Sequence, residues 1–432
     1  MLFKDKKRKL LAGLDLNDRQ SQISYIYTDR DEPQTISSVS GQEQYNVPTV
    51  LCKRNEVNQW FYGREAVAQA QAGDGVLVEH ILEHCYNGRG MEVDGQEFDP
   101  LELLALFVRR MVARLQSLTD GDKPDAMMIT VEELDNRMIE VLNALADKLG
   151  LESDKVFFQS HLESMYHFVI HQPEDIRRQQ VVICDYGSEC MKSYRLEMNR
   201  KTTPVVCYVE DKVYRDMPVG RIPEEEPYRD RACTRLDEQF TKVVNEICEG
   251  RIISTVYLIG EGFLGNWCRE SLKILCRNRR VFQGNNLYSK GACYCLAERC
   301  VPTELSSGYV FLGRDKVKAN VGMYFYRNGA EEYYPVIDAG VNWFEARHEW
   351  DILLEDENRI HFLVTPLNKR NKREFIMTLE GLPERAGGFS RIHLTVQFMS
   401  ESRIGITAVD MGFGEFFDSN HTEWKEEIAW EE

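Results

Sequence analysis

Apolar and polar positions in the first part of the chain predict short strands that end in turns. Apolar runs that finish on an Asp occur twice, at residues 10–15 and 181–185, and return strands follow at 21–27 and 191–196. A run of this kind predicts a hairpin with a carboxylate at its tip. Two hairpins of the same form indicate a duplicated α/β unit with a cleft between its halves.

Helical patterns separate these strands. Asp99 can cap a helix, Pro100 suits its first position, and Glu102 completes a capping box. A second helix is expected from Asn136 to a stop at Gly150. The apolar face of the first helix consists of Leu104, Phe107, Val108, Met111, Val112 and Leu115.

A third strand is expected at residues 255–259, and it runs into the turn Gly260-Glu261-Gly262. A helix over 266–276 should follow, and residues 281–292 lead into a final helix. Between the second hairpin and this strand, we expect strands at 205–209 and 213–217 and a helix over 237–249.

The pattern becomes all-β after residue 308. Strands at 323–326 and 333–337 flank Asn328-Gly329, which is a strong hairpin signal. Four apolar residues that alternate with polar ones predict a strand with one buried face. These are Ile392, Leu394, Val396 and Phe398. We therefore predict an α/β domain over 1–300, a linker at 301–308, a β domain over 309–418 and an acidic tail at 419–432.

Length and composition set the class of protein. The chain has 432 residues and a formal net charge of -17, which argues against nucleic acid and acidic lipid surfaces as partners. Its 12 cysteines include no Cys-x-x-Cys pair, which favours a reducing compartment and leaves a zinc site only as an alternative. His80 and His84 have helical spacing but lack the adjacent Glu of the zinc-protease motif. No secretion signal and no membrane insertion are expected, so the predicted location is cytoplasmic.

The two Asp-tipped hairpins, the Gly260-Glu261-Gly262 turn and the β pattern of residues 379–410 together resemble the actin-like ATPase superfamily. Within it, the chain is similar to a divergent, lidless member of the seventy-kilodalton heat-shock chaperone family. The resemblance spans about residues 10–417. It implies a duplicated ribonuclease-H-like ATPase fold followed by a substrate-binding β-sandwich.

The same resemblance implies which residues bind ligands. Asp15 and Asp185 would hold Mg²⁺, and ATP or ADP would lie between the hairpins. The peptide groove of the β-sandwich would be lined by Met323, Phe325 and Ile337, unless all three belong to its core. The nucleotide contacts implied are Asp15, Asn17, Asp18, Arg19, Asp185, Gly187, Ser188, Gly260, Glu261 and Gly262.

Several residues depart from the family pattern. At the tip of the first hairpin, this chain has Asn17-Asp18-Arg19 where the family has Gly-Thr-Thr. At the tip of the second, it has Ser188-Glu189-Cys190 where the family has Gly-Gly-Thr. A carboxylate ~5 Å from a phosphate charge would repel it by roughly 3 kcal/mol at an effective dielectric constant of 20. Ser160 replaces an acidic residue that positions the attacking water. The segment between residues 196 and 255 is shorter than the family's adenine-clamping subdomain. Hydrolysis is therefore not expected.

These observations leave three hypotheses for function. The first is a non-hydrolysing or weakly nucleotide-binding scaffold whose β-sandwich binds a peptide or protein partner. The second is an active ATP-dependent chaperone that hydrolyses Mg-ATP, and the third is an actin-like structural or assembly protein. The acids Asp15, Asp18, Asp185 and Glu189 either bind Mg²⁺ or Mn²⁺ or form a solvated rim.

Overall fold

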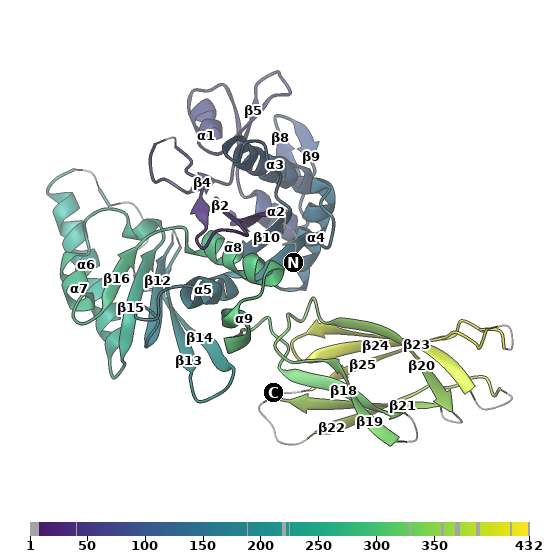
Figure 1. The fold of residues 1–432 in the computed structure, drawn as a ribbon. Coiled ribbons are helices and arrows are strands. Elements are labelled where there is room, and N and C mark those ends of the chain that lie inside the picture. Colours follow the sequence, from purple (N-terminus) through teal and green to yellow (C-terminus); the bar gives the residue numbers. More distant parts are fainter. Residues whose placement is uncertain are drawn as a thin grey trace, which may run out of the picture. The chain divides into compact units, whose positions relative to one another are not determined.

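The computed structural model divides the chain into two compact units, Met1–Val310 and Phe311–Glu432, and each is described by itself. Figure 1 shows their elements. The structure describes residues 8–39, 41–187, 189–217, 222–223, 225–327, 330–355, 358–367, 372–385, 389–414 and 417–430.

The N-terminal unit consists of two successive α/β halves. The first half contains β1 (Leu10–Asp15), β2 (Gln20–Tyr27), β3 (Gln34–Thr35), β4 (Val47–Pro48), β5 (Leu51–Arg54), β6 (Trp60–Tyr62), α1 (Gly63–Gln71), β7 (Gly75–Val78), α2 (Ile81–Asn87), β8 (Met91–Val93), β9 (Gln96–Phe98), α3 (Pro100–Leu118), β10 (Ala126–Val131), α4 (Asn136–Leu149), β11 (Val156–Ser160) and α5 (His161–Ile170). The second contains β12 (Gln180–Tyr186), β13 (Met191–Asn199), β14 (Val205–Tyr214), α6 (Tyr228–Cys248), β15 (Ile253–Ile259), the 3-10 turn η1 (Glu261–Phe263), α7 (Arg269–Leu275), β16 (Arg280–Gln283) and α8 (Leu287–Cys300), before α9 (Glu304–Gly308) and β17 (Tyr309–Phe311).

The main sheets of the two halves repeat one topology. The first has the order β11-β10-β1-β2-β3, and the second has the order β16-β15-β12-β13-β14 with β17 beyond β14. In each, the first strand pairs antiparallel with its hairpin partner and parallel with the strand that follows a crossover. Asp15 lies opposite Thr130 and Asp185 opposite Ile259, so both carboxylates stand at the carboxyl ends of their parallel pairs. The duplicated hairpins predicted from the sequence are confirmed.

The helix signals of the sequence were also informative. The Asp99 side chain accepts a hydrogen bond from the Leu101 amide at 2.9 Å, and Pro100 is the first residue of α3. Gly150 ends α4 in the left-handed conformation, with φ 67°. Glu102, however, bonds the Lys148 ammonium at 2.5 Å, and this long-range ion pair uses the carboxylate that a capping box would need.

Two helices, α5 and α8, join the halves of the N-terminal unit. Helix α8 packs on the first sheet, where a Cβ added at Gly13 would lie 2.4 Å from the Ser289 carbonyl oxygen. Helix α5 packs on the second sheet through Phe168, whose ring centroid lies 5.5 Å from that of Tyr257. In Figure 1, α5 and α8 lie between the two sheets.

The C-terminal unit consists of antiparallel strands. They are β18 (Ala319–Arg327), β19 (Ala330–Ile337), β20 (Arg347–Glu355), β21 (Arg359–Pro366), β22 (Arg373–Thr378), β23 (Phe389–Ser400), β24 (Arg403–Asp410) and β25 (Glu423–Ala429). They form two sheets with the orders β19-β18-β21-β22 and β20-β23-β24-β25. Along β23 the alternating residues Ile392, Leu394, Val396 and Phe398 are all buried, as predicted.

Some expectations about element boundaries were wrong. The strands expected at 205–209 and 213–217 are one strand, β14, and α6 begins at Tyr228 rather than near residue 237. The linker at 301–308 contains α9. The acidic tail contains β25, which pairs with β24 and buries Ile428. Strands β18 and β19 pair as the predicted hairpin, but Asn328 and Gly329 lie outside the described residues.

Candidate functional site

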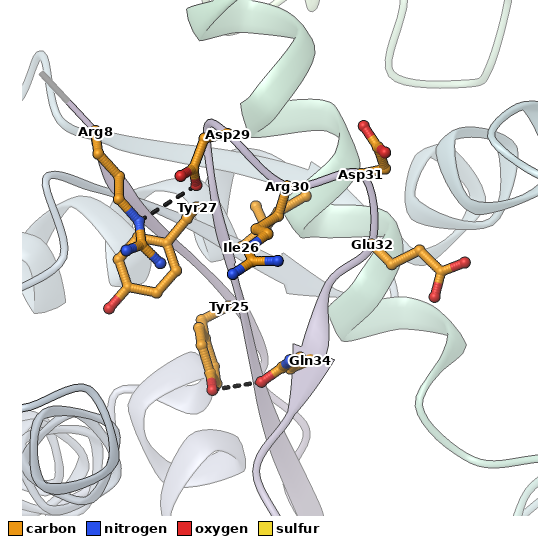
Figure 2. A pocket seen from close by; sticks show the side chains of 9 residues that line it. All are labelled: Arg8, Tyr25, Ile26, Tyr27, Asp29, Arg30, Asp31, Glu32 and Gln34. Carbon is orange, nitrogen blue, oxygen red and sulfur yellow. Dashed lines mark hydrogen bonds and ion pairs between the residues drawn. The ribbon is translucent and has the colours of Figure 1, made fainter. Parts of the chain in front are cut away.

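Two hollows stand out among the described residues of the N-terminal unit. The smaller, of about 580 Å³, is a shallow surface hollow beside β2 (Figure 2). Its Arg8 guanidinium pairs with Asp29 at 3.3 Å and lies 3.5 Å from the centre of the Tyr27 ring. Arg8 is therefore already paired within the hollow, and none of the sequence-predicted site residues lines it.

The larger hollow is a cleft of about 1060 Å³, with residues of both halves in its walls. Of the ten predicted nucleotide contacts, Gly262 is not among the lining residues, and Ser188 lies outside the described part of the chain. The eight that line the cleft are Asp15, Asn17, Asp18, Arg19, Asp185, Gly187, Gly260 and Glu261.

One wall of the cleft contains a buried ion pair between Asp15 and His161. The His161 Nε2 atom lies 2.8 Å from Asp15 Oδ1, and both residues are buried. Burial lowers the pKa of His161, but the carboxylates of Asp15, Glu132 and Asp185 together raise it by more, so the net shift is upward. The first residue of α5 thus places an imidazole, whose raised pKa favours the protonated form, against the carboxylate at the end of β1.

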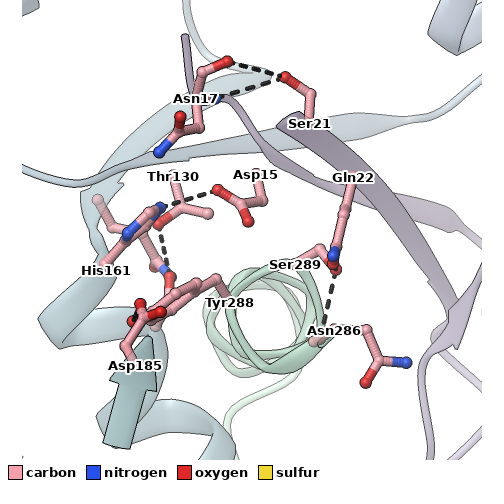
Figure 3. Close-up of polar contacts among 12 residues, drawn as sticks. Asp15, Asn17, Ser21, Gln22, Thr130, His161, Asp185, Asn286, Tyr288 and Ser289 are labelled. Carbon is pink, nitrogen blue, oxygen red and sulfur yellow. Dashed lines mark hydrogen bonds and ion pairs between the residues drawn. The ribbon is translucent and has the colours of Figure 1, made fainter. Parts of the chain in front are cut away.

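The opposite carboxylate, Asp185, accepts a hydrogen bond from Tyr288. The Tyr288 hydroxyl donates to Asp185 Oδ2 at 2.8 Å. Burial raises the pKa of Asp185, while Tyr288 and His161 lower it by less. The rings of His161 and Tyr288 are stacked, with centroids 3.9 Å apart and planes at 8° (Figure 3). A continuous chain of contacts, Asp15–His161–Tyr288–Asp185, therefore crosses the cleft.

The hairpin tips are likewise held by protein groups. The Arg19 guanidinium pairs with Glu189 across the cleft at 3.2 Å, and the Arg19 amide donates to Asn17 Oδ1 at 3.1 Å. Asp18 accepts from the Glu83 amide at 2.9 Å and pairs with His80 Nδ1 at 2.6 Å. Asp18, His80 and Glu83 bring ligand-type atoms together, but hydrogen bonds within the set already satisfy Asp18.

The two glycines of the 260–262 turn make room for Tyr186. A Cβ at Gly260 would lie 2.4 Å from the Tyr186 carbonyl oxygen, and one at Gly262 would lie 2.4 Å from the Tyr186 ring. The space that these glycines leave open is thus filled by the protein. This packing accounts for the Gly-x-Gly pattern without a ligand.

The donor set of the cleft does not fit a magnesium ion bridging Asp15 and Asp185. Mg²⁺ requires near-octahedral oxygen ligands. Here Asp15 faces an imidazole of raised pKa and Asp185 faces a phenol hydroxyl, so a cation at this place would have to displace both.

Sequence reasoning missed His161 and Tyr288. The one available signal was the neighbouring Ser160, where the sequence departs from the pattern of the family that it resembles. A lone His at a helix start carries no indication of its partner, which is 146 residues away in the sequence.

The residues expected to line a peptide groove in the C-terminal unit lie differently. Met323 and Ile337 are buried in the core, with 3% and 7% of their surface exposed, so they do not line an open groove. Phe325 is half-buried, and its ring lies 5.4 Å from that of Tyr334. Tyr334 in turn contacts Trp350, with centroids 6.4 Å apart.

Two family models match the chain. The model described as the C-terminal part of a family of unknown function, DUF5716, matches residues 32–314. The chain belongs to this family. A domain of unknown function, DUF8552, matches residues 316–430, so the two matches meet close to the division at Val310 and Phe311. A search of curated proteins found no match.

The DUF5716 match covers the whole cleft apart from the first hairpin, which precedes residue 32. It includes both His161 and Tyr288. Among the described residues, no helix combines the length and the apolar character that a membrane span requires.

Proposed function

We propose that this member of the DUF5716 family is a non-hydrolysing scaffold. It would be built on an actin-type fold whose nucleotide cleft is closed by side chains, and its C-terminal β-sandwich would bind a peptide or protein partner. Support for the fold comes from the repeated strand order of the two sheets and from the equivalent positions of Asp15 and Asp185.

The observation that carries the proposal is the chain of contacts Asp15–His161–Tyr288–Asp185. A magnesium ion bound by both carboxylates would have to break a buried ion pair. The ion would take the place of the His161 imidazole at Asp15, so part of its binding free energy would be spent on separating that pair. Magnesium-dependent nucleotide binding is therefore disfavoured before any phosphate contact is considered.

Charged side chains at the hairpin tips also disfavour nucleotide binding. The Arg19 side chain is a cation of the cleft wall that could attract phosphate, but it pairs with Glu189. Asp18 is held at the rim by His80 and by the amide of Glu83. The carboxylates of Asp18 and Glu189 would repel a triphosphate, because both they and the phosphates are negatively charged.

The partner surface is proposed at the edge strand β19. An edge strand offers unpaired backbone groups, and an extended peptide can bind by adding one more strand. On β19, Tyr333 and Tyr334 are 44% and 37% exposed, and Tyr324, which lies opposite Tyr333 on β18, is 46% exposed. Partly exposed tyrosines contribute contact area with little loss of conformational entropy, and Tyr is enriched among residues that dominate binding.

Calorimetric titration of Mg-ATP into the full chain tests the closed cleft. We expect no magnesium-dependent heat with the wild type and the same result with Asp185→Asn. Asp154→Asn, an exposed substitution outside the cleft, is the matched control. Tight Mg-ATP binding that Asp185→Asn abolishes and Asp154→Asn preserves would overturn the proposal and favour an active chaperone. Sedimentation that depends on nucleotide would favour an assembling protein instead.

A further inference from the structure

Helices α5 and α8 cross at one point where their backbones touch. A Cβ added at Gly291 would lie only 1.9 Å from the Ser164 carbonyl oxygen, so no residue larger than glycine fits there without movement. One turn further along α8, at i+4 from Gly291, is Cys295. Residues four apart share a helix face, so this thiol faces the part of α5 next to Ser164.

Three side chains of metal-ligand type meet beside this crossing. Glu163 and His167 are spaced i, i+4 on α5, and Cys295 comes from α8. One ligand atom from each lies within 4.8 Å of the other two. Glu163 and Cys295 are 3% exposed, and the His167 side chain is 14% exposed. None of the three lines the cleft that contains Asp15 and Asp185.

The spacing of these atoms is compatible with tetrahedral coordination of one ion. His167 Nε2 lies 3.8 Å from Glu163 Oε1, which is beyond hydrogen-bond length. Bonds of about 2.0–2.3 Å from zinc to oxygen, nitrogen and sulfur place tetrahedral ligands roughly 3.3–3.7 Å apart. An inward shift of the three ligand atoms would therefore bring them to coordination distance, and a water would supply the fourth ligand.

The types of ligand narrow the choice of ion. A thiolate, an imidazole and a carboxylate together suit Zn²⁺, whereas Mg²⁺ and Ca²⁺ prefer oxygen ligands alone. All cysteines of the chain are free, and Cys295 is among them.

We propose that Glu163, His167 and Cys295 form a zinc site that joins α5 to α8. Binding releases the thiol proton of Cys295 and any proton on the ligating nitrogen of His167 to solvent, and a water completes the four ligands. The ion would link α5 and α8, the two helices that lie between the sheets of the N-terminal unit. It would also hold together the helices that carry His161 and Tyr288.

The test uses the full chain and two metals. Elemental analysis of the purified protein should find about one zinc per chain. After chelator treatment, Co²⁺ should bind and give the sulfur-to-cobalt charge-transfer absorption of a thiolate ligand. Cys295→Ser should abolish this absorption. It should also weaken Co²⁺ binding by about 100-fold or more, since losing even an outer-shell partner costs 10–100-fold.

Cys293→Ser is the matched control, because Cys293 lies on the same helix and is equally buried but is outside the ligand set. It should retain both the absorption and the affinity. Glu163→Gln should weaken binding while the circular dichroism spectrum stays unchanged. Absence of zinc together with absence of the cobalt absorption in the wild type overturns the proposal. So does an absorption that survives Cys295→Ser. The wild-type result stands even if a variant fails to fold, and it does not depend on nucleotide binding.

Discussion

The imidazole of His161 lies flat against the phenol ring of Tyr288, and each ring bonds a different carboxylate of the central cleft. Asp15 and Asp185 end equivalent strands of two sheets with the same order, so a symmetric arrangement places two acids face to face. Two like charges in a partly buried cleft repel each other unless a cation or a proton donor separates them. Here the chain itself supplies both.

Removing His161 should leave the Asp15 carboxylate buried without its cation. We expect His161→Ala to lower the free energy of unfolding of the N-terminal unit by about 3 kcal/mol, the typical loss for breaking a buried pair. Urea unfolding of the full chain measures it. The double variant with Asp15→Asn should cost less than the sum of the two single variants.

His80→Ala is the control for this experiment. Its pair with Asp18 is as short, at 2.6 Å, but the His80 side chain is 48% exposed. Solvent screens such a pair, so its loss should cost less than about 1 kcal/mol. Equal losses at His80 and His161 would show that burial of the Asp15 pair has no special effect.

Tyr288→Phe should keep the ring stack and remove only the hydroxyl that donates to Asp185. A buried acceptor that loses its donor costs about 1–3 kcal/mol in unfolding free energy. Tyr25→Phe removes a hydroxyl that bonds Gln34 on the exposed surface, and it should change stability by less than about 0.5 kcal/mol. If the two variants unfold at the same urea concentration, the contact with Asp185 does not stabilise the protein.

Gly291→Ala should destabilise the chain although alanine favours helices. At a free helix position, Gly→Ala stabilises by about 1 kcal/mol. At the crossing with α5 the added carbon would overlap the Ser164 carbonyl, and overpacking costs about 1–3 kcal/mol. Gly284→Ala, where a Cβ meets nothing within 4 Å, should be nearly neutral. A thermal melt that rises with Gly291→Ala would contradict the close crossing.

The C-terminal unit should lose stability in acid through Asp410. This buried carboxylate accepts from Arg385 at 2.6 Å and from the amides of Gly412 and Asn420. Burial raises the pKa of Asp410, but these donors lower it by more, so its folded pKa is below the ordinary value. A lowered folded pKa means that its contribution is complete above about pH 4, the unfolded value, and is lost as the pH falls further.

Asp410→Asn should therefore cost about 3 kcal/mol at neutral pH and weaken the acid dependence of unfolding below about pH 4. Thermal melts followed over a pH series measure both effects. Asp351→Asn is the control, because it pairs with His393 on the surface, where the two side chains are 46% and 36% exposed. If Asp410→Asn lost stability below about pH 4 as steeply as the wild type does, Asp410 would not be the group responsible for the acid dependence.

Binding of an extended peptide to the β19 edge should depend on Tyr334. We expect Tyr334→Ser to weaken the best binders of a peptide library by about tenfold, equivalent to about 1.4 kcal/mol. Fluorescence anisotropy with labelled peptides provides the measurement. Tyr228→Ser, at a tyrosine that is 61% exposed in the N-terminal unit, should leave peptide affinity unchanged. Equal effects of the two substitutions would argue against this edge as the binding surface.

The sequence by itself determined the local elements of this protein. Apolar runs ending in Asp gave both hairpins, and Asp99 and Gly150 marked the start of α3 and the end of α4 because capping depends on neighbours in the chain. Strand β25 escaped prediction because most of its residues are exposed and charged, so its pairing with β24 leaves little apolar pattern.

Only the tertiary structure decided what the cleft contains. Asp15 meets His161 across 146 residues, and Asp185 meets Tyr288 across 103. Likewise Cys295 meets Glu163 and His167 because Gly291 lets two helices touch. Such contacts depend on how helices cross between sheets, and the spacing of residues along the chain does not predict that crossing.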